Sequence, residues 1–86
     1  MIAYVGGIEM VLHAMSAHPK ATLVQENGCW ALRVLAQDED TKVKIASLGG
    51  IETALHAMSA HPKATEVQDS GCFALASLAI NKDNRG

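Results

Sequence analysis

The stretch LHAMSAHPKAT at Leu12–Thr22 recurs letter for letter at Leu55–Thr65, 43 residues later. The Gly-Gly-Ile-Glu sequence that precedes it recurs at the same distance, at Gly6–Glu9 and Gly49–Glu52. The chain is therefore one unit written twice. A period of this size is typical of stacked repeat proteins, because a single unit of this kind cannot bury its apolar face alone.

The first unit comprises residues 1–43, and its apolar residues predict a short amphipathic helix. Ile8, Val11, Leu12 and Met15 follow the spacing i, i+3, i+4, i+7. We expect this helix to start after a break at Gly6-Gly7. It should end at His18-Pro19, because the residue before a proline is disfavoured in helical geometry.

A longer helix is predicted over residues 21–37, in which Gly28 permits close approach of another backbone. Residues 38–41 form a polar break whose carboxylates favour the start of a third, short helix over residues 42–48. In the second unit, residues 44–86, the middle and long helices are expected over residues 51–60 and 64–80.

Composition limits the class of protein. Nearly half of the residues are apolar but only Tyr4, Trp30 and Phe73 are aromatic, which favours closely packed helices. The formal charge of −2 splits into about −2 for the first unit and about 0 for the second, so neither unit offers a basic face and nucleic acid is not an expected partner. We see no membrane segment or secretory signal.

The cysteines and histidines do not form a recognisable site. Cys29 and Cys72 are one repeat apart, beyond disulfide reach in a regular stack, and are expected to be buried thiols in a reducing compartment, either cytoplasm or nucleus. His13 and His18 lack the spacing of metal ligands on one helix, and His56 repeats the arrangement of His13. No phosphate loop or nucleophile motif is present, so we expect no metal, cofactor or enzymatic activity.

Three segments carry a family resemblance: the first spans the junction of the two units, and the other two lie in the second unit. KVKIASLGGIE at Lys42–Glu52, followed by Val67-Gln68 and by GCFALASLA at Gly71–Ala79, resembles the pattern of the armadillo repeat. The resemblance covers essentially the whole chain and occurs twice in register. It implies an all-α fold, a right-handed solenoid with two repeats of short, middle and long helix, and a single domain over residues 1–86.

In that family the long helices line a groove that holds other proteins, often as extended peptides. The resemblance places Trp30 and Phe73 at the position of an aromatic residue that grips the ligand. Val34 and Ser77 stand where the family has asparagine, so the amide that binds a peptide backbone is absent.

Comparison of the two units points to the same surface. Along the long helix the units differ at positions that all fall on one helical stripe. The stripe contains Leu23/Glu66, Glu26/Asp69, Asn27/Ser70, Trp30/Phe73, Arg33/Ala76, Val34/Ser77 and Gln37/Ile80. Such a stripe is either solvent-exposed surface that tolerates substitution or a ligand surface. Large apolar residues on it favour contact with a ligand.

The predicted function is therefore a non-enzymatic module that binds a protein or peptide partner along the concave face of its long helices. Trp30 and Phe73 are the predicted anchors for apolar or cationic side chains. The predicted groove consists of Glu26, Trp30, Arg33, Val34, Gln37, Asp69, Phe73, Ser77 and Ile80.

The alternative function is a structural self-assembly unit with no foreign ligand. About three repeats are normally needed for a stable solenoid, and this chain has two. We therefore expect either a piece of a longer array or a homo-oligomer. Head-to-tail stacking, exchange of helices, and burial of the groove against its twin all remain open at this point.

Overall fold

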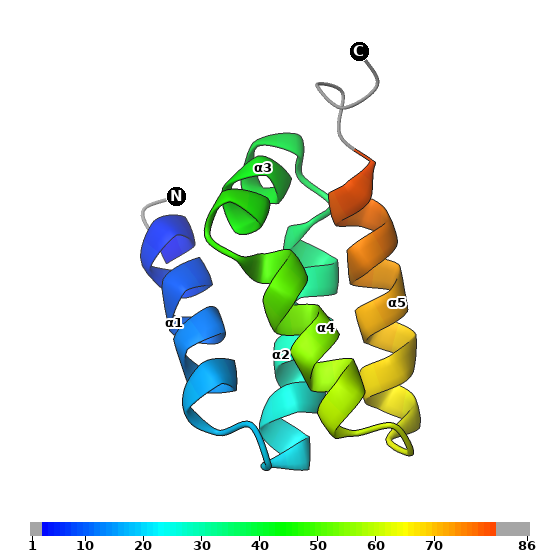
Figure 1. Cartoon of the computed structure of the whole chain (residues 1–86). Coiled ribbons are helices and arrows are strands. Elements are labelled where there is room, and N and C mark those ends of the chain that lie inside the picture. Colours follow the sequence, from blue (N-terminus) through cyan, green and yellow to red (C-terminus); the bar gives the residue numbers. More distant parts are fainter. Residues whose placement is uncertain (1–2, 81–86) are drawn as a thin grey trace.

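The computed structural model describes the backbone of residues 3–80 and the side chains of residues 6–80. Within this part of the chain five α-helices follow one another, and no strand occurs. The all-α prediction is confirmed. The helices are α1 (Ala3–Ala17), α2 (Thr22–Leu35), α3 (Glu39–Ser47), α4 (Gly50–Ala60) and α5 (Thr65–Ala79) (Figure 1).

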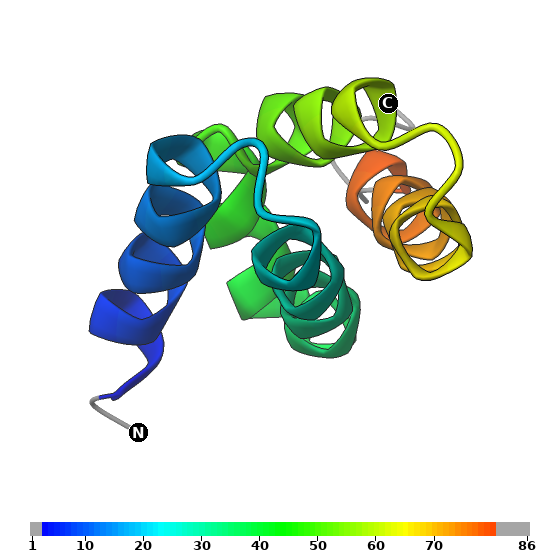
Figure 2. The ribbon, with the colours of Figure 1, turned by 90° about the horizontal axis from the view of Figure 1, so that it is seen from below.

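The two long helices lie side by side. α2 and α5 fall within the ranges predicted for them, and the contact between them is the most extensive that any two helices make. α1 packs against α2 as α4 packs against α5 (Figure 2). The same pair of helices thus occurs twice, and the two pairs bury a common face between them.

The predicted break at Gly6-Gly7 is wrong, because α1 runs uninterrupted through both glycines. The same pair does separate two helices in the second unit, where Gly49 has a φ of +90° between α3 and α4. A Cβ added to Gly6 or Gly7 would meet no atom within 4 Å, whereas Gly50 lies directly against Ile45 of α3. Packing of α3 onto α4, rather than the glycine pair itself, therefore determines where the chain turns.

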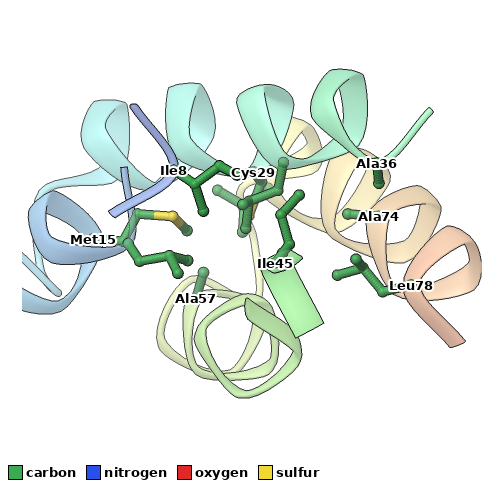
Figure 3. Close-up of a cluster of buried hydrophobic side chains, with 11 residues drawn as sticks. Ile8, Met15, Cys29, Ala36, Ile45, Ala57, Ala74 and Leu78 are labelled. Carbon is green, nitrogen blue, oxygen red and sulfur yellow. The ribbon is translucent and has the colours of Figure 1, made fainter. Parts of the chain in front are cut away.

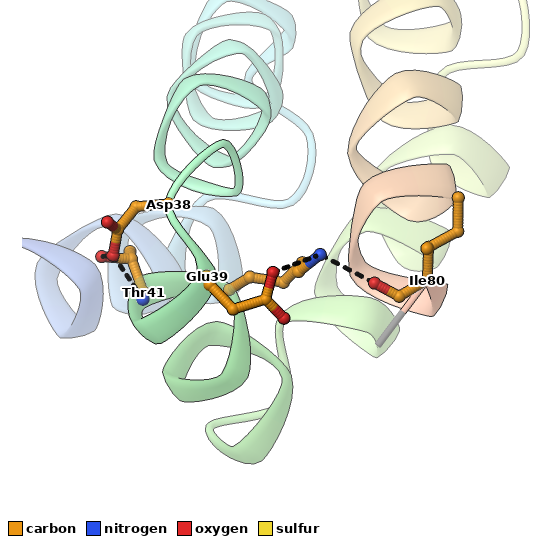
Figure 4. A network of polar contacts seen from close by, with 5 residues as sticks. Asp38, Glu39, Thr41 and Ile80 are labelled. Atoms are coloured by element: carbon orange, nitrogen blue, oxygen red, sulfur yellow. Dashed lines mark hydrogen bonds and ion pairs between the residues drawn. The ribbon is translucent and has the colours of Figure 1, made fainter. Parts of the chain in front are cut away.

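The third helix begins earlier than predicted. α3 starts at Glu39, so most of the expected polar break is its first turn, and Asp38 is its N-cap. The backbone N–H and the hydroxyl of Thr41 both donate to Oδ2 of Asp38, at 2.9 Å each (Figure 4). These bonds satisfy a free helical N–H and lower the pKa of the Asp38 carboxyl below its ordinary value.

Buried apolar side chains from all five helices form one core (Figure 3). Ile45 from the short helix α3 is fully buried among them. The core consists of Ile8, Leu12, Met15, Cys29, Leu32, Ala36, Ile45, Ala57, Val67, Ala74 and Leu78. Since both units contribute, neither has a separate interior.

The cysteines differ in environment although their sequence positions are equivalent. Cys29 is fully buried, and burial raises the pKa of its thiol to about 11. Cys72 is exposed, so the expectation of a buried thiol is wrong there: it lies on a side of α5 that the described helices do not cover. Both thiols are free. Among residues 3–80, no helix combines the length and apolarity needed to cross a membrane.

Candidate functional site

The side-by-side arrangement of α2 and α5 brings the variable stripes of the two units together. We call the predicted groove residues the long-helix face: Glu26, Trp30, Arg33, Val34, Gln37, Asp69, Phe73, Ser77 and Ile80. They come from the two long helices and from the residues that directly follow them.

Large apolar side chains on this face are exposed to solvent. Trp30 is 57% exposed and Ile80 66%, and Val34 and Phe73 are each exposed by more than two fifths. Transfer of such surface out of water is favourable, and apolar side chains gathered on one face are typical of contact sites. A partner that covered the long-helix face would therefore bury apolar surface that is exposed in the free chain.

Arg33 connects the two helices across this face. Its Cζ lies 4.5 Å from the centroid of the Phe73 ring, and its Nη1 lies 3.7 Å from Oδ2 of Asp69. The ion pair is exposed and contributes little stability, but together the two contacts hold the guanidinium over the ring.

This contact changes the predicted role of Phe73. One side of its ring is already occupied by the Arg33 cation, so the ring cannot receive a ligand cation there without displacing Arg33. Trp30 is more exposed than Phe73. Of the two predicted anchors, Trp30 is therefore the more accessible.

The other members of the face are placed less uniformly. Glu26 and Ser77 are half-buried, whereas Gln37 lies beyond the end of α2 and donates from Nε2 to the Arg33 carbonyl at 3.2 Å. Ile80 is the C-cap of α5, and its carbonyl accepts a hydrogen bond from Nζ of Lys42 at 2.7 Å (Figure 4). Both of these bonds are exposed to solvent.

One position of the stripe is not surface at all. Ser70 of α5 is only 3% exposed, although its counterpart Asn27 on α2 is exposed. The stripe on α5 turns partly toward the first unit, which explains why a small residue occupies this position in the second unit. A position that differs between the units is therefore not always exposed to solvent.

Two glutamines have a structural role that sequence analysis did not detect. Nε2 of Gln25 donates to the carbonyls of Met15 and His18, at 3.0 and 2.9 Å, where α1 ends. Gln68 repeats both bonds at the end of α4. Each amide satisfies helix-terminal carbonyls that would otherwise lack partners. The sequence did contain an indication of this role, because a polar residue is identical in both units on an otherwise apolar helix face.

His61 joins the two units through two side-chain contacts. Its Nε2 donates to the Pro19 carbonyl at 2.7 Å, and its Nδ1 lies 3.3 Å from the hydroxyl of Thr22, which can donate to it. Among the described residues, His, Cys, Asp and Glu side chains nowhere gather in a group of three that could hold a metal ion.

A separate hollow of about 520 Å³ lies where the ends of α1 and α4 meet, away from the long-helix face. It is lined by Met15, Ser16, Pro19, Gln25, Thr53, His56, Ala57, Ser59 and Ala60. Within this lining no hydrogen bond joins His56 to either serine, and Gln25 is committed to capping α1. The lining contains no Asp, Glu, Lys or Arg side chain that could recognise a charged ligand.

Comparison with known proteins adds no relative to this picture. No protein-family model matches the chain, and neither does a curated protein or a solved structure.

Proposed function

We propose that this chain is a non-enzymatic protein-interaction module of the armadillo type, and that it binds a protein or peptide partner along the long-helix face. The observation that carries the proposal is the group of exposed apolar side chains on neighbouring helices. Trp30 and Val34 lie on α2, and Phe73 and Ile80 lie on or directly after α5.

Three features support the finer fold. The 43-residue unit occurs twice in register, each unit pairs a middle with a long helix, and the long helices pack side by side. A right-handed solenoid of two armadillo repeats is consistent with all three. In such a solenoid the long-helix face is the concave face.

The face fits an extended segment with an apolar or cationic side chain placed on Trp30. The carboxylates of Glu26 and Asp69 flank the aromatic residues, and Arg33 is already engaged by Asp69. An incoming cation would therefore meet an aromatic surface beside a carboxylate, which is favourable for both stacking and charge. Val34 and Ser77 provide no amide for the peptide backbone, so side chains should dominate recognition.

The test is selection of binding peptides from a displayed library, followed by calorimetry with the selected peptide. Trp30→Ala should weaken binding at least tenfold, because truncation of an anchor of this type commonly costs about 2 kcal/mol or more. Phe73→Ala should have a smaller effect, since Arg33 already covers part of that ring.

Met10→Ala is the matched control, because Met10 is a large apolar residue of α1 that is 73% exposed outside the long-helix face. Equal affinities for the Trp30 and Met10 variants would contradict the proposal. Sedimentation of the Trp30→Ala, Phe73→Ala double variant separates recognition from assembly: loss of the peptide with unchanged oligomer size supports recognition, and unfolded monomer supports assembly.

A further inference from the structure

Equivalent residues of the two units are buried to different extents, and the residues that differ in this way lie on one face of each unit. Leu12, Cys29 and Leu32 of the first unit are all buried beneath the second unit. Their counterparts are not: Leu55 is 47% exposed, Cys72 is exposed and Leu75 is half-buried. We call this less covered surface of the second unit the trailing face, formed by Ile51, Leu55, Met58, Cys72 and Leu75. Ile51 and Met58 are half-buried there, whereas Ile8 and Met15 of the first unit are buried.

The opposite pattern occurs at the other end of the molecule. Val24, Ala31 and Leu35 of the first unit are half-buried, whereas their counterparts in α5 are fully buried against the first unit. We call this surface of the first unit the leading face, formed by Val11, Ala14, Val24, Ala31 and Leu35. These counterparts are Val67, Ala74 and Leu78.

The leading face contains an open hollow of about 280 Å³ between α1 and α2. Its lining includes Val11, Ala14, Val24 and Gly28. The residues that correspond to these in the second unit are all buried where the units pack. The hollow is therefore the unfilled half of an interface whose filled form exists inside the same chain.

We propose that the trailing face of one copy of this chain binds the leading face of a second copy, head to tail. The contact repeats the packing between the two units. Every trailing-face residue is identical to a residue that the second unit covers, from Ile8/Ile51 to Leu32/Leu75. On the leading face only Val11 departs from its counterpart, Ala54, so the surfaces that meet are nearly those already packed.

A polar contact extends the match. His61 of the second unit bonds to the Pro19 carbonyl and the Thr22 hydroxyl of the first. In the head-to-tail contact His18 of one copy takes the place of His61. The Pro62 carbonyl of the neighbouring copy takes the place of the Pro19 carbonyl, and its Thr65 hydroxyl takes the place of the Thr22 hydroxyl. All three residues are exposed and identical to their counterparts, so this bond can be repeated without rearrangement.

The two faces differ from each other, so the contact is heterologous and does not close at two copies. The average mass should therefore rise with concentration beyond that of a dimer. Sedimentation of the wild-type chain over a range of concentrations measures this. A mass that stays at 9.1 kDa throughout would overturn the proposal and leave these faces to a different protein partner.

A mixing experiment identifies the orientation. Leu55→Glu places a charge on the trailing face and Ala14→Glu places one on the leading face. Each variant alone should be a monomer, because one half of every contact is blocked. An equimolar mixture should form a dimer of twice 9.1 kDa, since each variant retains the half that the other lacks.

Leu23→Glu is the control for added charge, because Leu23 is 70% exposed outside both end faces and the second unit carries Glu66 there. This variant should associate like the wild type, and so should Trp30→Ala, which keeps the proposal separate from ligand binding at the long-helix face. Association that survives both end-face charges, or a mixture that remains monomeric, would overturn the head-to-tail contact.

Cys72 gives an independent measurement on the wild-type chain. Head-to-tail packing would bury it as Cys29 is buried within the chain. Its rate of reaction with a thiol reagent should fall as the protein concentration rises, and it should stay constant in the Leu55→Glu variant. A Cys72 rate that is independent of wild-type concentration would contradict the proposal.

Discussion

Leu32 and Leu75 occupy the same place in the two units, and each directly follows an alanine, Ala31 and Ala74. Leu32 is fully buried and Leu75 is only half-buried. Cys29 and Cys72 repeat the difference one turn earlier. Equivalent residues thus have different energetic roles, because burial in stacked units is determined by which side of a unit is covered by its neighbour.

The largest effect is expected when each of the two leucines is replaced in turn. Leu32→Ala should lower the free energy of unfolding by about 3 kcal/mol, as expected for a fully buried leucine, and Leu75→Ala by about 1 kcal/mol. Urea denaturation at the same low protein concentration measures both. Equal losses would mean that the units are equally covered, contrary to the packing described.

A smaller difference is expected for the glutamines. Gln25→Met keeps the length of a buried side chain but leaves two helix-terminal carbonyls without their donor, so we expect a loss of about 2 kcal/mol. Gln68 is less buried, so water can replace its amide more easily and Gln68→Met should be milder. Thermal unfolding of the two variants ranks them directly, and the reverse order would contradict this account.

The glycines should respond with opposite signs. Gly49→Ala should destabilise the chain by about 1 kcal/mol, because its φ of +90° is unfavourable for a residue with a Cβ. Gly6→Ala should stabilise it by about 0.5 kcal/mol, because alanine is the better residue inside a helix and meets no neighbour there. If both substitutions destabilise, the continuous α1 helix is incorrect.

The smallest effect concerns Asp38 and is visible through pH. The pKa of this carboxyl is lower in the folded chain than its ordinary value of 3.8, because it accepts both bonds from Thr41. The ionised group therefore contributes stability above that value, and the contribution is lost as the pH falls through the folded pKa.

Asp38→Ala should accordingly lower Tm at neutral pH, and the difference from the wild type should shrink as the pH falls below 3.8. Asp40→Ala is a suitable control, since Asp40 is exposed within the first turn of the same helix. A difference in Tm that is independent of pH would exclude the N-cap as its cause.

Local sequence predicted the helical elements well where a proline or an apolar spacing fixed them. Both long helices follow His-Pro breaks and lie within the predicted ranges. The failures occurred where local signals were equivalent. Gly6-Gly7 and Gly49-Gly50 share the sequence Gly-Gly-Ile-Glu, but only the second pair packs against a helix that forces the chain to turn.

The exposure of the long-helix face was predicted in part. The stripe of variable residues correctly placed Trp30, Val34, Phe73 and Ile80 on exposed surface. It failed at Ser70, which is only 3% exposed, and it could not show that Arg33 covers the Phe73 ring. Such contacts join residues from different units, and periodicity within one helix contains no information about them.

The sequence by itself determined an all-α chain of two equivalent units, because apolar spacing and proline breaks act over a single helix and recur with the 43-residue period. Only the tertiary structure decided which copy of each residue is buried, where α1 continues and α3 stops, and which surfaces are exposed. The physical reason is that these outcomes depend on the neighbour that covers each face, and two identical segments can have different neighbours.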